Sequence, residues 1–137
     1  MARVLMIEDN QHDVTIARLI LATSFDFAYA ATFQDALEQL SKETPDVVLL
    51  DLNLPDSNGM ETLAQLAKQH PDIPIVVWSG AGDAADAIRH GADEFLLKDG
   101  TLLGVQSALA SAIARHKFKS VKEDISALQK LTKSDNK

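Results

Sequence analysis

The 137-residue chain contains no cysteine, few aromatic residues and no long hydrophobic run. The lack of cysteine excludes disulfide bonds and thiolate chemistry. No apolar stretch approaches the roughly 20 residues needed to span a bilayer, and the run Val4–Ile7 is too short for a signal peptide. We therefore expect a cytoplasmic protein with no membrane partner. At this length, one domain can bury a single hydrophobic core.

Acidic residues outnumber basic ones, and the excess is confined to the first part of the chain. Residues 1–114 carry 6 basic and 17 acidic side chains, whereas residues 115–137 carry 7 basic and 3 acidic ones. The overall net charge of -7 argues against nucleic acid or an anionic membrane as a partner. The change of sign near Arg115 predicts a change of organisation at that point.

Short apolar runs alternate with amphipathic stretches along the chain. The runs Val4–Ile7, Val47–Leu50 and Ile75–Trp78 are almost continuously apolar, as is typical of parallel strands that are covered on both faces. Weaker strand candidates lie at Phe27–Ala30 and Glu94–Leu97. Regular alternation of strands and helices predicts an α/β fold with a parallel sheet and right-handed crossovers.

Helices are predicted between these strands from the spacing of apolar residues. Five helices are expected. Three span residues 11–24, 60–69 and Ala84–Arg89, one begins after a cap at Thr32, and one begins at Leu102. The fourth in chain order is short. The last is expected to run past the core to about Leu131.

Polar residues stand where the predicted strands end. Glu8 and Asp9 follow the first strand, Asp51 the third and Lys98 the fifth, while Ser79 ends the fourth. Because ligands of such sheets bind beyond the carboxyl ends of the strands, we expect these side chains to share one crevice. Three clustered carboxylates need cations to offset their repulsion. Lys98 supplies one charge and Mg²⁺, which prefers oxygen ligands, is expected to supply the rest.

This set of groups is suited to phosphoryl transfer onto a carboxylate. A metal ion and Lys98 would neutralise the charge of a transferring phosphoryl group, with a carboxylate as nucleophile. Such reactions depend on positioning and electrostatics more than on acid–base groups. The absence of a candidate histidine base agrees with this interpretation.

Four segments in this order resemble the receiver domain of bacterial two-component response regulators. The segments are 4–10 (VLMIEDN), 46–59 (DVVLLDLNLPDSNG), 74–80 (PIVVWSG) and 91–98 (GADEFLLK). The resemblance covers roughly residues 2–118. It implies a doubly wound (βα)5 fold, flavodoxin-like, with a five-stranded parallel sheet in the order 2-1-3-4-5. This chain would add a shortened fourth helix and an extended C-terminal helix.

The resemblance also implies a role for each site residue. Asp51 corresponds to the phosphoacceptor, and Glu8 and Asp9 to the acidic pair that holds Mg²⁺. Asp51 and the backbone carbonyl of Asn53 would complete the metal ligands. The phosphoryl donor would be a histidine kinase or a histidine phosphotransfer protein.

Three further residues match the switching apparatus of the family. Ser79 corresponds to the hydroxyl residue that turns toward the phosphoryl group, and Lys98 to the lysine that pairs with it. Phe95 stands at the aromatic switch position. In the family, the hydroxyl and then the ring move inward on phosphorylation, which shifts a two-state population.

The chain departs from the family pattern after the fourth and fifth strands. Asp99 replaces the usual proline, which makes a cis peptide bond unexpected. The stretch from Ser79 to Lys98 is shorter than usual, so the helix Ala84–Arg89 is short. We therefore predict that partner binding does not use the usual surface of the fourth unit.

The C-terminal residues form a separate unit in this interpretation, with a receiver at 1–118 and a helical extension at 119–137. Phe118, Val121, Ile125 and Leu128 have heptad spacing, which predicts a homodimer or a downstream protein target bound through this helix. The tail is too short for a DNA-binding domain, so no DNA partner is expected. Residues 133–137 are expected to be disordered. The chain is either a stand-alone receiver or a fragment.

Two other classes of function compete with a phosphorylated switch. A degenerate receiver would bind proteins independently of phosphorylation, a role for which Asp99 and the short fourth helix leave room. A dinucleotide enzyme would need a glycine-rich turn after the first strand, where Glu8-Asp9-Asn10 stands. We therefore expect a self-phosphorylating signalling switch and not a turnover enzyme.

Overall fold

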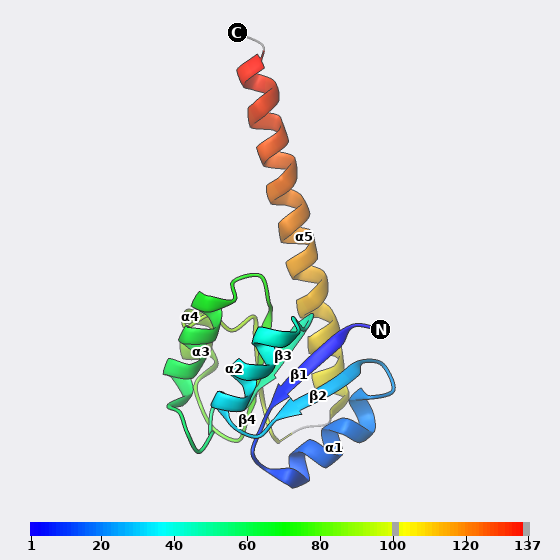
Figure 1. Ribbon diagram of the computed structural model, residues 1–137, viewed down its shortest axis with the longest axis vertical. Helices are drawn as coiled ribbons and strands as arrows, with labels where there is room; N and C mark the ends of the chain where they lie inside the picture. Colours follow the sequence, from blue (N-terminus) through cyan, green and yellow to red (C-terminus); the bar gives the residue numbers. More distant parts are fainter. Residues whose placement is uncertain (100–101, 136–137) are drawn as a thin grey trace.

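The computed structural model describes residues 1–99 and 102–135, in which five strands alternate with five helices (Figure 1). In chain order the elements are β1 (Arg3–Ile7), α1 (Gln11–Leu21), β2 (Asp26–Ala30), α2 (Phe33–Lys42), β3 (Val47–Leu50), α3 (Gly59–Gln69), β4 (Ile75–Ser79), α4 (Ala84–Arg89), β5 (Glu94–Leu97) and α5 (Leu102–Asp135). The predicted elements are confirmed. The fourth helix is short, with six residues.

The strands form one parallel sheet in the order β2-β1-β3-β4-β5, which confirms the predicted topology. The register determines which strand ends are neighbours. Ile7 at the end of β1 pairs with Leu50 at the end of β3, and Ser79 pairs with Leu97 across β4 and β5. The residues that follow these strands therefore lie side by side at one edge of the sheet.

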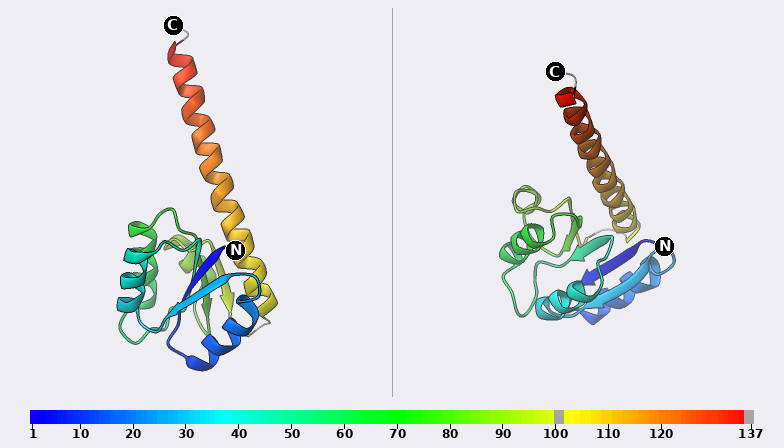
Figure 2. Two further views of the ribbon diagram at one scale, coloured as in Figure 1. Left: turned by 45° about the vertical axis from the view of Figure 1, so that its right-hand side comes forward. Right: turned by 45° about the horizontal axis from the view of Figure 1, so that its top comes forward.

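Helices cover both faces of the sheet (Figure 2). Alternate residues of each strand face opposite cores. Leu5 and Ile7 of β1 pack with residues of α2 and α3. Val4 and Met6 pack with residues of α1 and α5. Because both faces are covered, the central strands are apolar except at their ends, as the sequence runs predicted.

Two side chains cap the N-terminus of α2. The predicted cap is confirmed, since the Thr32 hydroxyl accepts a hydrogen bond from the Asp35 N–H at 3.1 Å. The Asp56 carboxylate, from the loop after β3, also accepts bonds from the N–H groups of Phe33 at 2.9 Å and Gln34 at 3.1 Å. The bond from Phe33 is the main cause of a lowered pKa for Asp56. These bonds tie the β3–α3 loop to the neighbouring helix.

Loss of the Asp56 cap should destabilise the fold in a pH-dependent way. We expect Asp56→Ala to lower the free energy of unfolding by about 1 kcal/mol at pH 7. Because the folded pKa is lowered, this contribution is present above the ordinary pKa of 3.8 and is lost as the pH falls through the folded value. Urea unfolding at pH 7 and pH 3 measures it. The exposed Asp72→Ala is the control, and equal losses in both variants would contradict the role.

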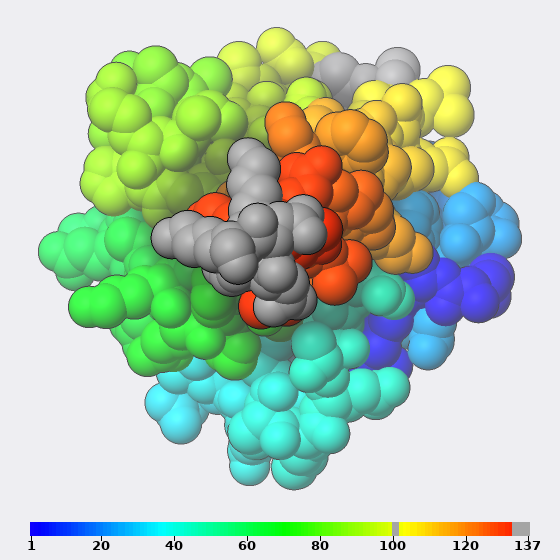
Figure 3. Space-filling model, turned by 90° about the horizontal axis from the view of Figure 1, so that it is seen from above, coloured from blue at the N-terminus to red at the C-terminus, as the bar shows by residue number. Residues whose placement is uncertain are grey.

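Helix α5 has 34 residues, and only its first part packs on the sheet. Leu102, Val105, Leu109 and Ala112 lie in the core, and the remainder projects away from the body (Figures 1 and 3). The helix passes Leu131 and reaches Asp135, so residues 133–135, expected to be disordered, are helical. Residues 136 and 137 lie outside the described residues. The predicted domain boundary at 118/119 falls within this helix and stays a prediction.

Among the described residues, no helix combines the length and the apolar character that crossing a bilayer requires. The same residues contain no cis peptide bond. The substitution of Asp99 for proline is thus accompanied by a trans connection after Lys98.

Candidate functional site

A pocket of about 460 Å³ opens at the carboxyl ends of the strands. Its walls come from the segments that follow β1, β3, β4 and β5. They are formed by Asp9, Asn10, Asp51, Leu52, Asn53, Ser79, Gly80, Ala81 and Lys98. Most of the residues predicted for the site therefore line one cavity, as the parallel topology requires.

The three predicted acidic residues form a cluster beside this pocket. Glu8, Asp9 and Asp51 each place a carboxylate oxygen within 4.8 Å of the others. Glu8 and Asp51 are buried, whereas Asp9 is exposed. Three oxygen donors with an open side fit a hard divalent cation such as Mg²⁺, which keeps several waters in protein sites.

Backbone groups orient two of these carboxylates. The N–H of Asn53 donates to Asp51 Oδ1 at 3.2 Å, and the N–H of Asn10 donates to Glu8 Oε2 at 3.3 Å. Both donors lie two residues after the carboxylate that they bind. The turn after β1 thus holds the Glu8 side chain, and the turn after β3 holds the Asp51 side chain.

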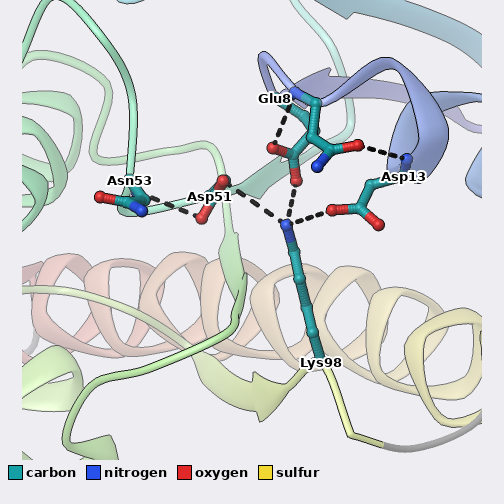
Figure 4. Close-up of polar contacts among 6 residues, drawn as sticks. Glu8, Asp13, Asp51, Asn53 and Lys98 are labelled. Atoms are coloured by element: carbon teal, nitrogen blue, oxygen red, sulfur yellow. Dashed lines mark hydrogen bonds and ion pairs between the residues drawn. The ribbon is translucent and has the colours of Figure 1, made fainter.

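The ammonium group of Lys98 lies among three carboxylates (Figure 4). Its Nζ is 2.5 Å from Glu8 Oε1, 2.7 Å from Asp13 Oδ2 and 3.5 Å from Asp51 Oδ2. It also lies 5.0 Å from the centre of the Trp78 ring, within the range of a cation–π interaction. Lys98 is therefore held mainly by Glu8 and Asp13, and only weakly by Asp51.

Burial among like charges raises the pKa of Glu8 from 4.5 to about 8. Desolvation is the largest cause, and the hydrogen bond with Asp51 adds to it, while Lys98 acts in the opposite direction. One ammonium charge shared by three carboxylates does not offset this burial. Burial also lowers the pKa of Lys98, but its bonds to Asp13 and Glu8 outweigh that effect, so the pKa is raised and Lys98 stays protonated.

The raised pKa of Glu8 predicts a pH-dependent cost in the metal-free protein. Between pH 4.5 and about 8, the folded state binds more protons than the unfolded state, so stability falls as the pH rises. We expect Glu8→Gln to raise the free energy of unfolding by about 1–3 kcal/mol at pH 8 and by much less at pH 5.

Thermal unfolding in EDTA and in Mg²⁺ at both pH values tests this expectation. Mg²⁺ should stabilise the unchanged protein more than the variant, because the variant lacks one anionic ligand. Glu38→Gln, at an exposed position of α2, should behave like the unchanged protein. A Glu8→Gln variant that is less stable at both pH values would contradict the assignment.

The two predicted switch residues lie on neighbouring strands. Ser79 is buried at the end of β4 and lines the pocket. Phe95 is half-buried on β5, pairs in register with Val77, and packs against the core on the side of α2 and α3. Gly82, with a φ of 129°, approaches the ring closely enough that an added Cβ would lie 3.4 Å from it. Phe95 itself does not line the pocket.

Sequence reasoning missed Asp13 and the contact of Trp78 with Lys98. Asp13 stands four residues after Asp9, in the first turn of α1, where acidic residues also favour the helix dipole. Asp9 precedes this helix, so helical spacing does not relate it to Asp13, and the local sequence gives no signal that Asp13 reaches Lys98. The contact between Lys98 and Trp78 joins two strand ends and has no signal in the local sequence.

Comparison with known proteins finds related sequences and related structures. A model of the response regulator receiver domain matches residues 4–128. LuxO, a luminescence regulatory protein of Vibrio campbellii, is 39% identical over 97 residues, covering 68% of this chain and 21% of LuxO. KdpE, the KDP operon transcriptional regulatory protein of Escherichia coli, is 31% identical over 141 residues, covering 93% of this chain and 62% of KdpE.

Solved structures agree with these matches. The crystal structure of NtrX from Brucella abortus has a TM-score of 0.83 and 28% sequence identity, covering 90% of this chain and 29% of NtrX. The chain spans about a fifth of the length of the LuxO proteins that it resembles. The similarity therefore concerns one domain of these larger proteins.

Proposed function

The chain belongs to the response regulator receiver domain family, whose members act as signalling switches, and from this membership we propose that Asp51 accepts a phosphoryl group from a phosphohistidine donor. The observation that supports the proposal is that Asp51, Lys98, Ser79 and Asp9 line the same pocket. The donor would be a histidine kinase or a histidine phosphotransfer protein. We also propose that the protein acts in the cytoplasm.

The proposed reaction is a direct transfer between nucleophiles. An oxygen of Asp51 forms a bond to phosphorus while the P–N bond of the phosphohistidine breaks. The imidazole nitrogen keeps the electron pair of that bond and takes up a proton from solvent. Glu8, Asp9, Asp51 and the backbone carbonyl of Asn53 would hold Mg²⁺. When bound, the ion supplies positive charge next to the phosphoryl oxygens.

Side chains of the pocket would read the new phosphoryl group. Lys98, 3.5 Å from Asp51 in this structure, can pair with a phosphoryl oxygen, and the Ser79 hydroxyl can donate to another. Phe95 would respond through the close packing of its ring against Gly82. The phosphoryl group thereby biases a two-state surface to which a partner binds.

Phosphorylation by a small donor tests the proposal. After incubation with Mg²⁺ and acetyl phosphate, we expect the intact mass to rise by about 80 Da, the mass of one phosphoryl group. Asp51→Asn should abolish this increase, because the amide is not a nucleophile. The exposed Asp72→Asn should leave it unchanged. Absence of the adduct with every donor would instead favour a degenerate receiver that binds proteins independently of phosphorylation.

The projecting part of α5 is proposed as the contact surface for a second copy of this chain. Phe118, Val121, Ile125, Leu128 and Leu131 are each at least half exposed there. The first four follow heptad a and d spacing, which is complementary to itself in a parallel pair. We call these four residues the apolar stripe. In such a pair, Lys117 of one copy faces Lys122 of the other across the helix flanks.

Self-association should therefore depend on both the stripe and the salt concentration. We expect a dimer whose affinity rises between low and high salt, because ions screen the Lys117–Lys122 repulsion. Ile125→Lys should abolish the dimer, and the exposed Lys119→Gln should not. Sedimentation equilibrium of the unchanged protein and of both variants, at low and high salt, measures the association. A monomer at every salt concentration and at high protein concentration would contradict the proposal.

A further inference from the structure

Asp13 takes part in holding Lys98 but lies outside the pocket. It is absent from the cavity wall and from the cluster of possible metal ligands. Its carboxylate oxygen lies 2.7 Å from Lys98 Nζ, closer than the oxygen of Asp51 at 3.5 Å. Figure 4 shows Asp13 and Asp51 on opposite sides of the ammonium group. The direct link between the Asp13 carboxylate and the proposed phosphoryl site is therefore its contact with Lys98.

The position of Asp13 is itself constrained. Its backbone N–H donates to the side chain of Asn10, the N-cap of α1, at 3.1 Å. Its side chain is 22% exposed and that of Lys98 is 16% exposed. The pair is thus partly shielded from water, where a charge-assisted hydrogen bond is stronger than on an open surface.

We propose that Asp13 is a positioning residue that holds the Lys98 ammonium group away from Asp51 and so restrains phosphoryl acceptance. This inference rests on the proposed function of Asp51. Lys98 has one charge and three hydrogen-bond donors, and Glu8 and Asp13 take the two short contacts. An arriving phosphoryl group must compete with Asp13 for the same ammonium. The Asp13 carboxylate would then determine how readily Asp51 is phosphorylated.

Removing the Asp13 carboxylate should release Lys98 toward Asp51. In Asp13→Asn we expect the rate of phosphorylation by acetyl phosphate, measured by intact mass, to rise about threefold to tenfold. Lys98 is then more available to stabilise charge that develops in the transition state. Asp13→Glu keeps the carboxylate and should restore a rate close to that of the unchanged protein. Glu38→Gln removes one exposed negative charge elsewhere and corrects for net charge.

Trp78 gives a second readout that needs neither metal nor phosphoryl donor. It is the single tryptophan of the chain, is largely buried, and lies 5.0 Å from Lys98 Nζ. A shift of the ammonium group should change its fluorescence. In EDTA, we expect altered emission intensity in Asp13→Asn, and emission like that of the unchanged protein in Asp13→Glu and Glu38→Gln. Circular dichroism verifies that each variant is folded.

The outcomes separate this inference from the proposed function. An Asp13→Asn variant that matches Glu38→Gln in phosphorylation rate overturns the inference, even if its emission differs. If the unchanged protein accepts no phosphoryl group, the proposed function fails. The metal-free emission then decides the positioning by Asp13: unchanged emission in Asp13→Asn overturns it, and changed emission that Asp13→Glu restores supports it.

Discussion

The burial of like charges at one edge of the sheet is the constraint on which the site depends. Glu8 and Asp51 are almost fully buried, and Asp9 lies within reach of both. Such a cluster is stable only if protons, cations or hydrogen bonds offset its charge. Lys98 supplies part of the offset, and the raised pKa of Glu8 reflects what Lys98 leaves uncompensated. The same deficit makes the site suited to a divalent cation.

The sheet supplies the rigidity that holds this arrangement together. Glu8 and Asp51 directly follow strands whose side chains pack on both faces of the sheet. The register of β1 with β3 brings Glu8 next to Asp51, and β5 carries Lys98 toward the same edge. The Asp56 cap fixes the loop between β3 and α3 to α2. The favourable free energy of packing on both faces thus offsets the unfavourable electrostatic free energy of the carboxylate cluster.

The last helix serves two parts of the molecule in different ways. Its first turns complete one core, through Val105, Leu109 and Ala112. Its later turns project from the body (Figure 1) and carry the exposed residues of the apolar stripe.

Local sequence was sufficient for the elements and for much of the site. Strands buried on both faces are apolar runs, so the polar residues at their ends stand out. The clustering of Glu8, Asp51, Ser79 and Lys98 was therefore predictable once the sheet was expected to be parallel. Only the tertiary structure decided how the single charge of Lys98 is shared. Asp13, Asp51 and Trp78 reach Lys98 from separate elements, and distances across a fold depend on packing and helix placement, which local periodicity does not encode.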